Sequence, residues 1–208
     1  MINIDFEIKK PEHTPLLIVI SGPSGIGKDT VIEGLKQRGC PFHFVITATT
    51  RLPRENEVDK QDYFFYSEDK FEEMIVSGEL LEYARVYSAY KGVPKSQVRQ
   101  ALASGEDVIM RLDVQGAQTV RNLCEDAVLI FLTADTKEEW LHRFRSRHSD
   151  SDDEIYLRVE TAKKEYQTLD IFDYIVVNRE NRLDETLDVI ESIITTEHHR
   201  VHPRKVAL

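Results

Sequence analysis

The chain has 208 residues, which is enough for one compact domain with its own core and one or two insertions. Its 27 basic and 37 acidic residues give a formal net charge of −10, which argues against a general nucleic-acid-binding surface. The net charge does not exclude binding of small phosphorylated ligands, because such ligands need only a local positive pocket. The two cysteines fit no disulfide framework, and neither a secretory signal nor a membrane-length apolar run is visible, so we expect a cytoplasmic protein with no nucleic-acid or membrane partner.

The hydrophobic pattern predicts alternating strands and helices after an irregular extension at residues 1–14. Strands are expected, in chain order, at residues 16–20, 42–47, 62–66, 80–90, 107–112, 127–132 and 172–177. Helices are expected at residues 28–38, 71–76, 95–103, 137–148, 152–167 and 183–196. This alternation predicts an α/β fold with a mostly parallel sheet and right-handed crossovers. Residues 48–97 break the alternation, and we interpret them as an inserted substrate-binding lobe.

The first buried strand runs directly into Gly22-Pro-Ser-Gly-Ile-Gly27-Lys28, which fits the pattern G-x-x-x-x-G-K. A buried strand precedes the motif and a helix follows it, as a phosphate-binding loop requires. Glycines let the backbone wrap a phosphate, the helix N-terminus directs N–H groups at it, and the lysine neutralises its charge. The sequence therefore predicts a phosphate-binding loop at residues 22–28.

Asp29 occupies the position after the lysine, where such loops usually have a Ser or Thr whose hydroxyl binds Mg²⁺. A carboxylate is also a hard oxygen ligand, which makes Asp29 a candidate ligand for Mg²⁺. As a ligand it would make nucleotide binding depend on the metal, because its charge repels metal-free phosphates. The alternative is that Asp29 only stabilises the N-terminus of the helix.

A second candidate anion site is Thr47-Ala-Thr-Thr-Arg51-Leu-Pro-Arg54, because paired arginines beside hydroxyls bind phosphate bidentately. Three more segments follow in order: Asp62-Tyr63-Phe-Phe65, Leu81-Glu82-Tyr83 and Leu112-Asp-Val-Gln-Gly116. Together with the phosphate loop, this ordered set resembles the guanylate kinases from residue 16 to about residue 180.

The resemblance implies a P-loop three-layer fold with a core, an inserted nucleotide-monophosphate-binding lobe and a helical lid. The core would comprise residues 1–47, 98–136 and 169–208, the lobe residues 48–97 and the lid residues 137–168. The implied reaction transfers the γ-phosphoryl group of ATP to GMP or dGMP with Mg²⁺, giving ADP and GDP in the case of GMP. Nothing in the sequence decides the oligomeric state.

The resemblance also assigns roles by position. ATP would contact Gly22, Pro23, Ser24, Gly25, Ile26, Gly27, Lys28, Asp29, Thr30 and Asn178. GMP would contact Thr47, Arg51, Arg54, Tyr63, Glu82, Lys91 and Asp113. Catalytic roles are implied for Lys28, Arg54, Arg143, Arg147 and Arg158. From the residues alone, other interpretations stay open: a solvated face for the lid arginines, a strand-end turn for Asn178 and a structural cap for Asp113.

Several positions besides Asp29 depart from the family pattern, among them Lys60 and the run Glu55-Asn56-Glu57, which stand where a Gly and Pro-Gly-Glu are usual. Lys91 and Val93 stand where a Tyr and a Ser or Thr are common, and Arg111 stands where an Asp is common. Strand alternation places Arg111 on the same face as Asp113, so an ion pair between them and direct ligand contact are both open.

Two other functions compete with the guanylate kinase interpretation. One is a sugar-phosphate kinase similar to ribose 1,5-bisphosphate phosphokinase, which also has Asp after the lysine but does not need Glu82 for a substrate without a base. The other is a non-catalytic guanylate-kinase-like interaction module. Those modules have lost residues of the phosphate loop, whereas Lys28 is present in this chain.

Overall fold

The computed structural model describes residues 8–55, 57–86, 89–147 and 152–208 of the chain. Its centre is a five-stranded sheet in the order β2-β7-β1-β8-β9, in which every neighbouring pair is parallel. The strands are β1 (Leu17–Ser21), β2 (Phe42–Phe44), β7 (Asp107–Arg111), β8 (Val128–Thr133) and β9 (Tyr174–Val177). This arrangement confirms the predicted α/β fold with a mostly parallel sheet.

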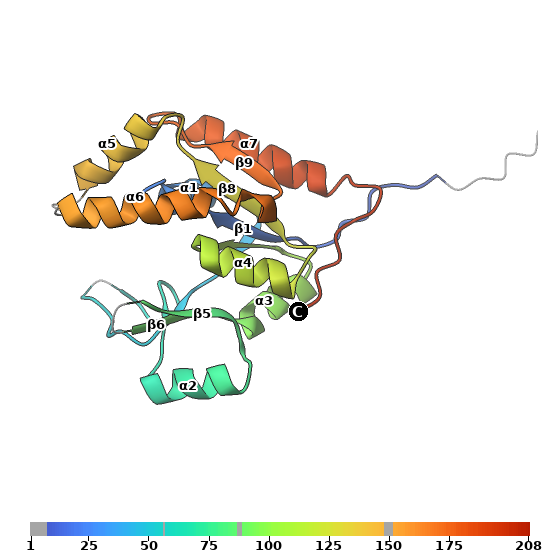
Figure 1. The fold of residues 1–208 in the computed structure, drawn as a ribbon. Helices are drawn as coiled ribbons and strands as arrows, with labels where there is room; N and C mark the ends of the chain where they lie inside the picture. Colours follow the sequence, from blue (N-terminus) through green and yellow to red (C-terminus); the bar gives the residue numbers. More distant parts are fainter. Residues whose placement is uncertain (1–7, 56, 87–88, 148–151) are drawn as a thin grey trace, which may run out of the picture.

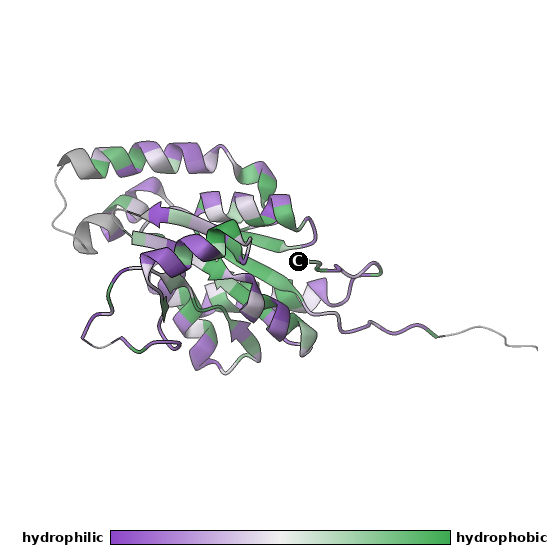
Figure 2. Cartoon of the chain, turned by 90° about the horizontal axis from the view of Figure 1, so that it is seen from below, coloured by the Kyte–Doolittle hydropathy of each residue, from purple (hydrophilic) through white to green (hydrophobic). Residues whose placement is uncertain are grey.

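The central sheet is apolar on both faces. In β1, Ile18 and Ile20 belong to one buried cluster, whereas Leu17 and Val19 belong to another on the opposite face. Figure 2 shows the hydrophobic residues along the central strands and the polar residues on the outer sides of the helices. The covering helices are α1 (Lys28–Gln37) and α7 (Leu183–Glu197) on one face, and α3 (Lys95–Ala103) and α4 (Val114–Leu123) on the other.

A smaller four-stranded sheet, in the order β4-β3-β6-β5, lies below the core in Figure 1. Its strands are β3 (Ala48–Thr49), β4 (Phe64–Phe65), β5 (Leu80–Val86) and β6 (Ala89–Pro94). Helix α2 (Glu68–Val76) covers its outer face, where Phe71 and Met74 pack against Ala48 and Leu80. The single strand expected at residues 80–90 is wrong, since the chain forms the antiparallel pair β5 and β6 there.

Two helices, α5 (Lys137–Arg147) and α6 (Asp152–Tyr166), project at the end of the molecule above the small sheet (Figure 1). Residues 148–151 of the expected connection lie outside the described residues. A short 3₁₀ turn, Leu169–Ile171, leads from α6 back to β9. Within the described ranges, no helix combines the length and the apolar composition that crossing a bilayer requires.

Two local differences from the expected elements have clear physical causes. Helix α4 was not expected, yet Asp113 caps it by accepting a hydrogen bond from the Gly116 amide at 2.7 Å. The strand expected at residues 42–47 ends at Phe44. Just beyond it, the Gln97 side chain bonds both backbone groups of Ile46, at 2.9 and 2.6 Å, in place of a neighbouring strand.

The segment after α7 is anchored to the core by a buried ion-pair network. The Glu197 carboxylate is 1% exposed and accepts hydrogen bonds from Arg204 at 2.8 and 3.1 Å. The Tyr174 hydroxyl donates to the same carboxylate at 2.6 Å, and Arg204 also pairs with Asp173 at 3.1 Å. The network therefore joins the end of the chain to β9 and to the last turn of α7.

Replacing Arg204 by Ala is expected to lower the free energy of unfolding by about 3 kcal/mol, because it leaves a buried carboxylate without its nearest and most buried cation. Urea denaturation measures this loss. Arg200→Ala is the matched control: its guanidinium is half exposed and 3.5 Å from the same carboxylate, so the expected loss is below about 1 kcal/mol. Equal losses in the two variants would contradict the role given to Arg204.

Candidate functional site

The glycine-rich loop connects β1 to α1 by a turn that only glycines allow. Gly22 has a φ of 138°, and a Cβ at this position would lie 2.4 Å from the Leu132 carbonyl oxygen. Gly27 has a φ of 98°, and its Cβ would lie 2.5 Å from the Asn178 side-chain nitrogen. The loop backbone is therefore pressed against β8 and Asn178, and α1 begins directly after it at Lys28.

Two side chains from distant parts of the chain support the loop. The buried Asn178 amide donates to the Ile26 carbonyl at 2.8 Å and accepts from the Thr186 hydroxyl at 3.1 Å. The Trp140 indole donates to the Ser24 carbonyl at 2.9 Å. The described contacts of Asn178 thus position the loop. Trp140 was not predicted, although it is the only tryptophan of the chain.

The Lys28 ammonium lies inside the loop. Its Nζ donates to the Gly22 carbonyl at 2.5 Å and to the Pro23 carbonyl at 3.0 Å. Burial lowers the pKa of Lys28 to about 8, while the carboxylates of Glu165 and Asp113 oppose this shift. Glu165, on α6, was not predicted as a site residue, and burial raises the pKa of its own carboxyl group. The loop lysine therefore faces acidic groups from both α6 and the cap of α4.

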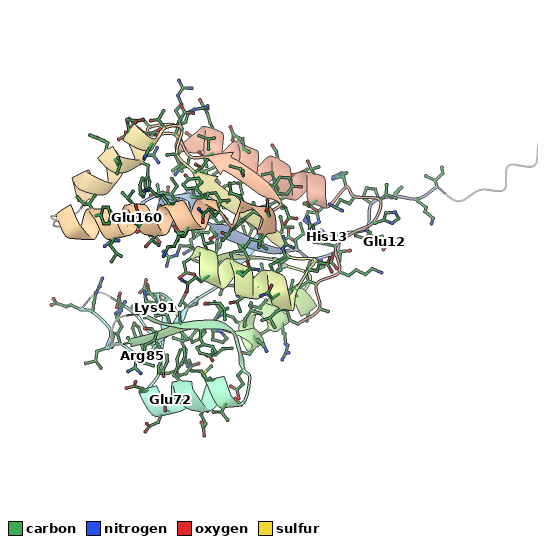
Figure 3. The ribbon with its side chains drawn as sticks, in the orientation of Figure 1. Glu12, His13, Glu72, Arg85, Lys91 and Glu160 are labelled. Atoms are coloured by element: carbon green, nitrogen blue, oxygen red, sulfur yellow. The ribbon has the colours of Figure 1, made fainter. Side chains whose placement is uncertain are left out.

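A cavity of about 590 Å³ joins the loop to the small sheet. It is lined by Ser24, Gly25, Ile26, Gly27, Lys28, Asp29, Arg51, Arg54, Tyr63, Lys91 and Arg111. On the small-sheet side, the Arg51 guanidinium lies 4.8 Å from the centre of the Tyr63 ring, and the Lys91 Nζ lies 5.9 Å from it. Strand alternation in β6 turns Tyr90 onto Phe71 of α2 and leaves Lys91 facing the core (Figure 3).

Glu57 holds the arginine loop of the small lobe in place. It forms a bidentate pair with Arg51, both N···O distances being 2.6 Å, and accepts from the Arg54 amide at 2.9 Å. The pKa of Glu57 is lowered to about 2, mainly by the hydrogen bonds from Arg51 and next by the hydrogen bond from the Arg54 amide. Sequence reasoning gave no role to Glu57, which stands three residues after Arg54 in a loop that also contains Glu55 and Asp59.

Two carboxylates expected to bind a base lie together at Gly116. A Cβ on this glycine would lie 3.2 Å from Glu82 Oε2 and 3.3 Å from Asp113 Oδ1. Burial, and then the charge of Asp113, raise the pKa of Glu82 to about 7. Thr47 lines a neighbouring cavity of about 360 Å³, together with Tyr63 and Arg111.

The predicted lid arginines are placed differently from one another. Arg158 of α6 donates to the Ser24 hydroxyl at 3.2 Å and thus reaches the phosphate loop. Arg143 of α5 pairs with Glu139, which also accepts from the Glu180 amide, and neither residue lines the cavity. The side chain of Arg147 lies outside the described part of the chain. Thr30 is exposed on the first turn of α1 and does not line the cavity.

Arg111 forms an ion pair with Asp29, and the alternative pair with Asp113 is not the one observed. The Asp29 side chain is 74% exposed and lines the cavity, so its oxygens are accessible to a cation. Among the described residues, no group of three or more His, Cys, Asp or Glu side chains is arranged to hold a metal ion. A Mg²⁺ ion at Asp29 fits this site if nucleotide phosphates and water supply its other ligands, as is usual for Mg²⁺.

Comparison with known proteins gives consistent matches. The family model described as guanylate kinase matches residues 14–197. The chain is 45% identical to guanylate kinase 2, chloroplastic/mitochondrial, of Oryza sativa subsp. japonica, covering 94% of this chain and 69% of that protein. It is 41% identical to the guanylate kinase of Bacillus subtilis, covering 91% and 94%. The crystal structure of guanylate kinase from Anaplasma phagocytophilum shares the fold, with a TM-score of 0.69, 24% identity and coverage of 91% and 89%.

Gly27→Ala is expected to lower the free energy of unfolding by about 2–4 kcal/mol, because it combines backbone strain with a collision against Asn178. Gly39→Ala is the matched control at the end of α1. Gly39 also has a positive φ, of 69°, but a Cβ there would meet nothing within 4 Å, so strain alone costs about 1 kcal/mol. Thermal and urea denaturation compare the two variants, and equal losses would contradict the close contact with Asn178.

Proposed function

The chain belongs to the guanylate kinase family and is an ATP:GMP phosphotransferase, and we propose that transfer takes place in the cavity between the phosphate loop and the small sheet. The observation that supports this location is the lining of the cavity. A phosphate loop forms one wall, and Arg51, Arg54, Tyr63 and Lys91 form the other. We further propose that residues 48–97 act as the GMP-binding lobe, residues 137–168 as the lid, and the remainder as the core.

ATP would bind through the loop, with its phosphates against the backbone N–H groups and Lys28. Two of the three N–H groups of Lys28 donate to loop carbonyls in this structure, which directs the ammonium at the loop interior. Arg158 reaches the same loop through Ser24, and Arg143 and Arg147 would approach from α5. Asn178 would act through Ile26, by holding the loop in its phosphate-binding form.

GMP would place its phosphate against the Tyr63 hydroxyl, Arg51, Arg54 and Lys91. Its guanine would lie between Glu82 and Asp113, whose carboxylates accept from the N1–H and the N2 amine. Thr47, which directly precedes β3, would also contact the base. Adenine turns an acceptor toward the same carboxylates, so AMP is expected to be a poor substrate.

The transfer itself needs positioning and positive charge more than covalent help from the protein. Both phosphate groups would enter one cavity whose walls carry Lys28, Arg54 and other cations. These cations stabilise the charge that spreads over the oxygens of the transferred group. Asp29 would hold Mg²⁺, which when bound with ATP neutralises charge on the phosphate oxygens.

The cell compartment and the pathway are also proposals. Both cysteines, Cys40 and Cys124, are unpaired thiols, which supports a reducing compartment such as the cytoplasm. The reaction places the protein in purine nucleotide metabolism.

A coupled assay with MgATP and one acceptor at a time tests the proposed function. GMP and dGMP are expected to be turned over, with AMP and ribose 1,5-bisphosphate at least about 100-fold poorer in kcat/KM. Lys28→Ala should lower kcat by at least about 100-fold without changing the melting temperature much, since Lys28 acts on phosphate charge. Preferred turnover of ribose 1,5-bisphosphate, or full activity of the Lys28 variant, would contradict the assignment.

The raised pKa of Glu82 makes GMP binding depend on pH. Guanine requires the ionised carboxylate, and with a pKa of about 7 most Glu82 side chains are protonated at pH 6. GMP affinity is therefore expected to be about tenfold weaker at pH 6 than at pH 8. Calorimetric titration across this range measures it. Glu82→Gln is the control, because the GMP phosphate titrates in both proteins and only the Glu82 contribution disappears. If GMP affinity depends on pH equally in Glu82→Gln and in the parent, Glu82 is not the source of the pH dependence.

A further inference from the structure

Arg111 lines the cavity between the phosphate loop, where ATP would bind, and the small sheet, where GMP would bind. It is the last residue of β7, in register with Ile20 of β1, one residue before that strand ends and the phosphate loop begins. Alternation along β7 places Arg111 on the same face as Ile109, the face that α1 covers. The core sheet therefore presents this guanidinium to the cavity, which Lys28 and Arg54 also line.

Asp29 is the partner that the structure gives to Arg111. It lies in the first turn of α1, which starts at the end of the phosphate loop, and the two side chains form an ion pair. The Asp29 side chain is 74% exposed and the Arg111 side chain 37%, so the pair borders open space that a ligand can enter. A phosphate that approaches the loop thus encounters an Arg111 side chain that is paired with Asp29.

We propose that Arg111 binds the phosphoryl group in transit from ATP to GMP, and that Asp29 holds its guanidinium until MgATP occupies the Asp29 carboxylate. This rests on the proposed function, in which Asp29 is a ligand of the nucleotide-bound Mg²⁺. The cation of the nucleotide replaces Arg111 at the carboxylate, and the planar guanidinium then has two N–H groups for phosphoryl oxygens. The core would in this way supply a second cation beside Lys28, opposite Arg51, Arg54 and Lys91 of the small lobe.

A simpler role is that Arg111 only neutralises Asp29 and never touches a phosphate. The two roles predict opposite coupling between the residues. If Arg111 binds phosphate, removing Asp29 both relieves repulsion and releases Arg111, so the gain in phosphate binding is larger when Arg111 is present. If Arg111 only neutralises Asp29, the carboxylate is already screened in the parent protein, and the gain is larger when Arg111 is absent.

Calorimetric titration of ATP in EDTA measures this coupling in the parent, Asp29→Ser, Arg111→Met and the double variant. Asp29→Ser is expected to tighten metal-free ATP binding at least about tenfold in the parent, and by a smaller factor in the Arg111→Met background. An equal or larger gain in the combined variant overturns the proposal. Melting temperatures establish that each variant is folded, and Arg111→Lys, which keeps the charge, serves as a second probe of the same site.

Steady-state kinetics with MgATP and GMP supply the second measurement. Arg111→Met should lower kcat at least about 100-fold, with a smaller change in the KM for ATP, and Arg111→Lys should retain an intermediate kcat. Arg38→Met is the matched control, since Arg38 follows α1 at its far end and pairs with Asp184 and Asp188 away from the cavity. Recovery of the parent kcat in the double variant, or an Arg111→Met kcat within about threefold of the parent, overturns the proposal. A parent protein that does not phosphorylate GMP would instead contradict the proposed function.

Discussion

The site depends on how closely the phosphate loop passes the neighbouring strand. At Gly22 there is no room for a Cβ, because the Leu132 carbonyl oxygen would lie 2.4 Å from it. This close approach lets the chain leave β1 and fold over the carboxyl end of the sheet before α1 begins. The positions of Lys28, Asp29 and the cavity all follow from that turn, and hydrogen bonds from Asn178 and Trp140 to two loop carbonyls support it.

The chain carries a net charge of −10, yet the walls of its cavity are basic. Acidic side chains balance these cations locally: Glu57 pairs with Arg51, Asp29 pairs with Arg111, and Glu165 and Asp113 face Lys28. Such partners lower the cost of collecting cations in one place before any phosphate is bound. When a phosphate binds, each cation that it contacts exchanges its carboxylate partner for a phosphate oxygen. Recognition is consequently short-range, because the overall charge does not attract nucleotides from a distance.

The sequence predicted the fold and the site best where a pattern of residue types is compatible with one local structure. Glycines before a lysine, between a buried strand and a helix, identified the phosphate loop, and alternation between two apolar faces identified the parallel sheet. Helix α4 was not expected, although Val114, Ala117 and Val120 have helical spacing and a structural cap was one of the interpretations left open for Asp113. The roles of Glu165 and Trp140 depend on partners that folding brings together from distant parts of the chain, and no local pattern in the sequence encodes such pairs.

Asp29 and Arg111 show how two departures from a family pattern explain each other. Taken singly, an acid beside the phosphate loop repels nucleotide, and an arginine at the end of a buried strand lacks a counter-charge. The parallel register of β1 with β7 places the end of β7 beside the start of the phosphate loop, and there the two charges form one pair. The departure at one position thus offsets the cost of the departure at the other. Because both side chains also line the cavity, the pair does more than restore neutrality: it keeps a cation at the phosphate site that the more common residue at position 111, an acid, would not provide.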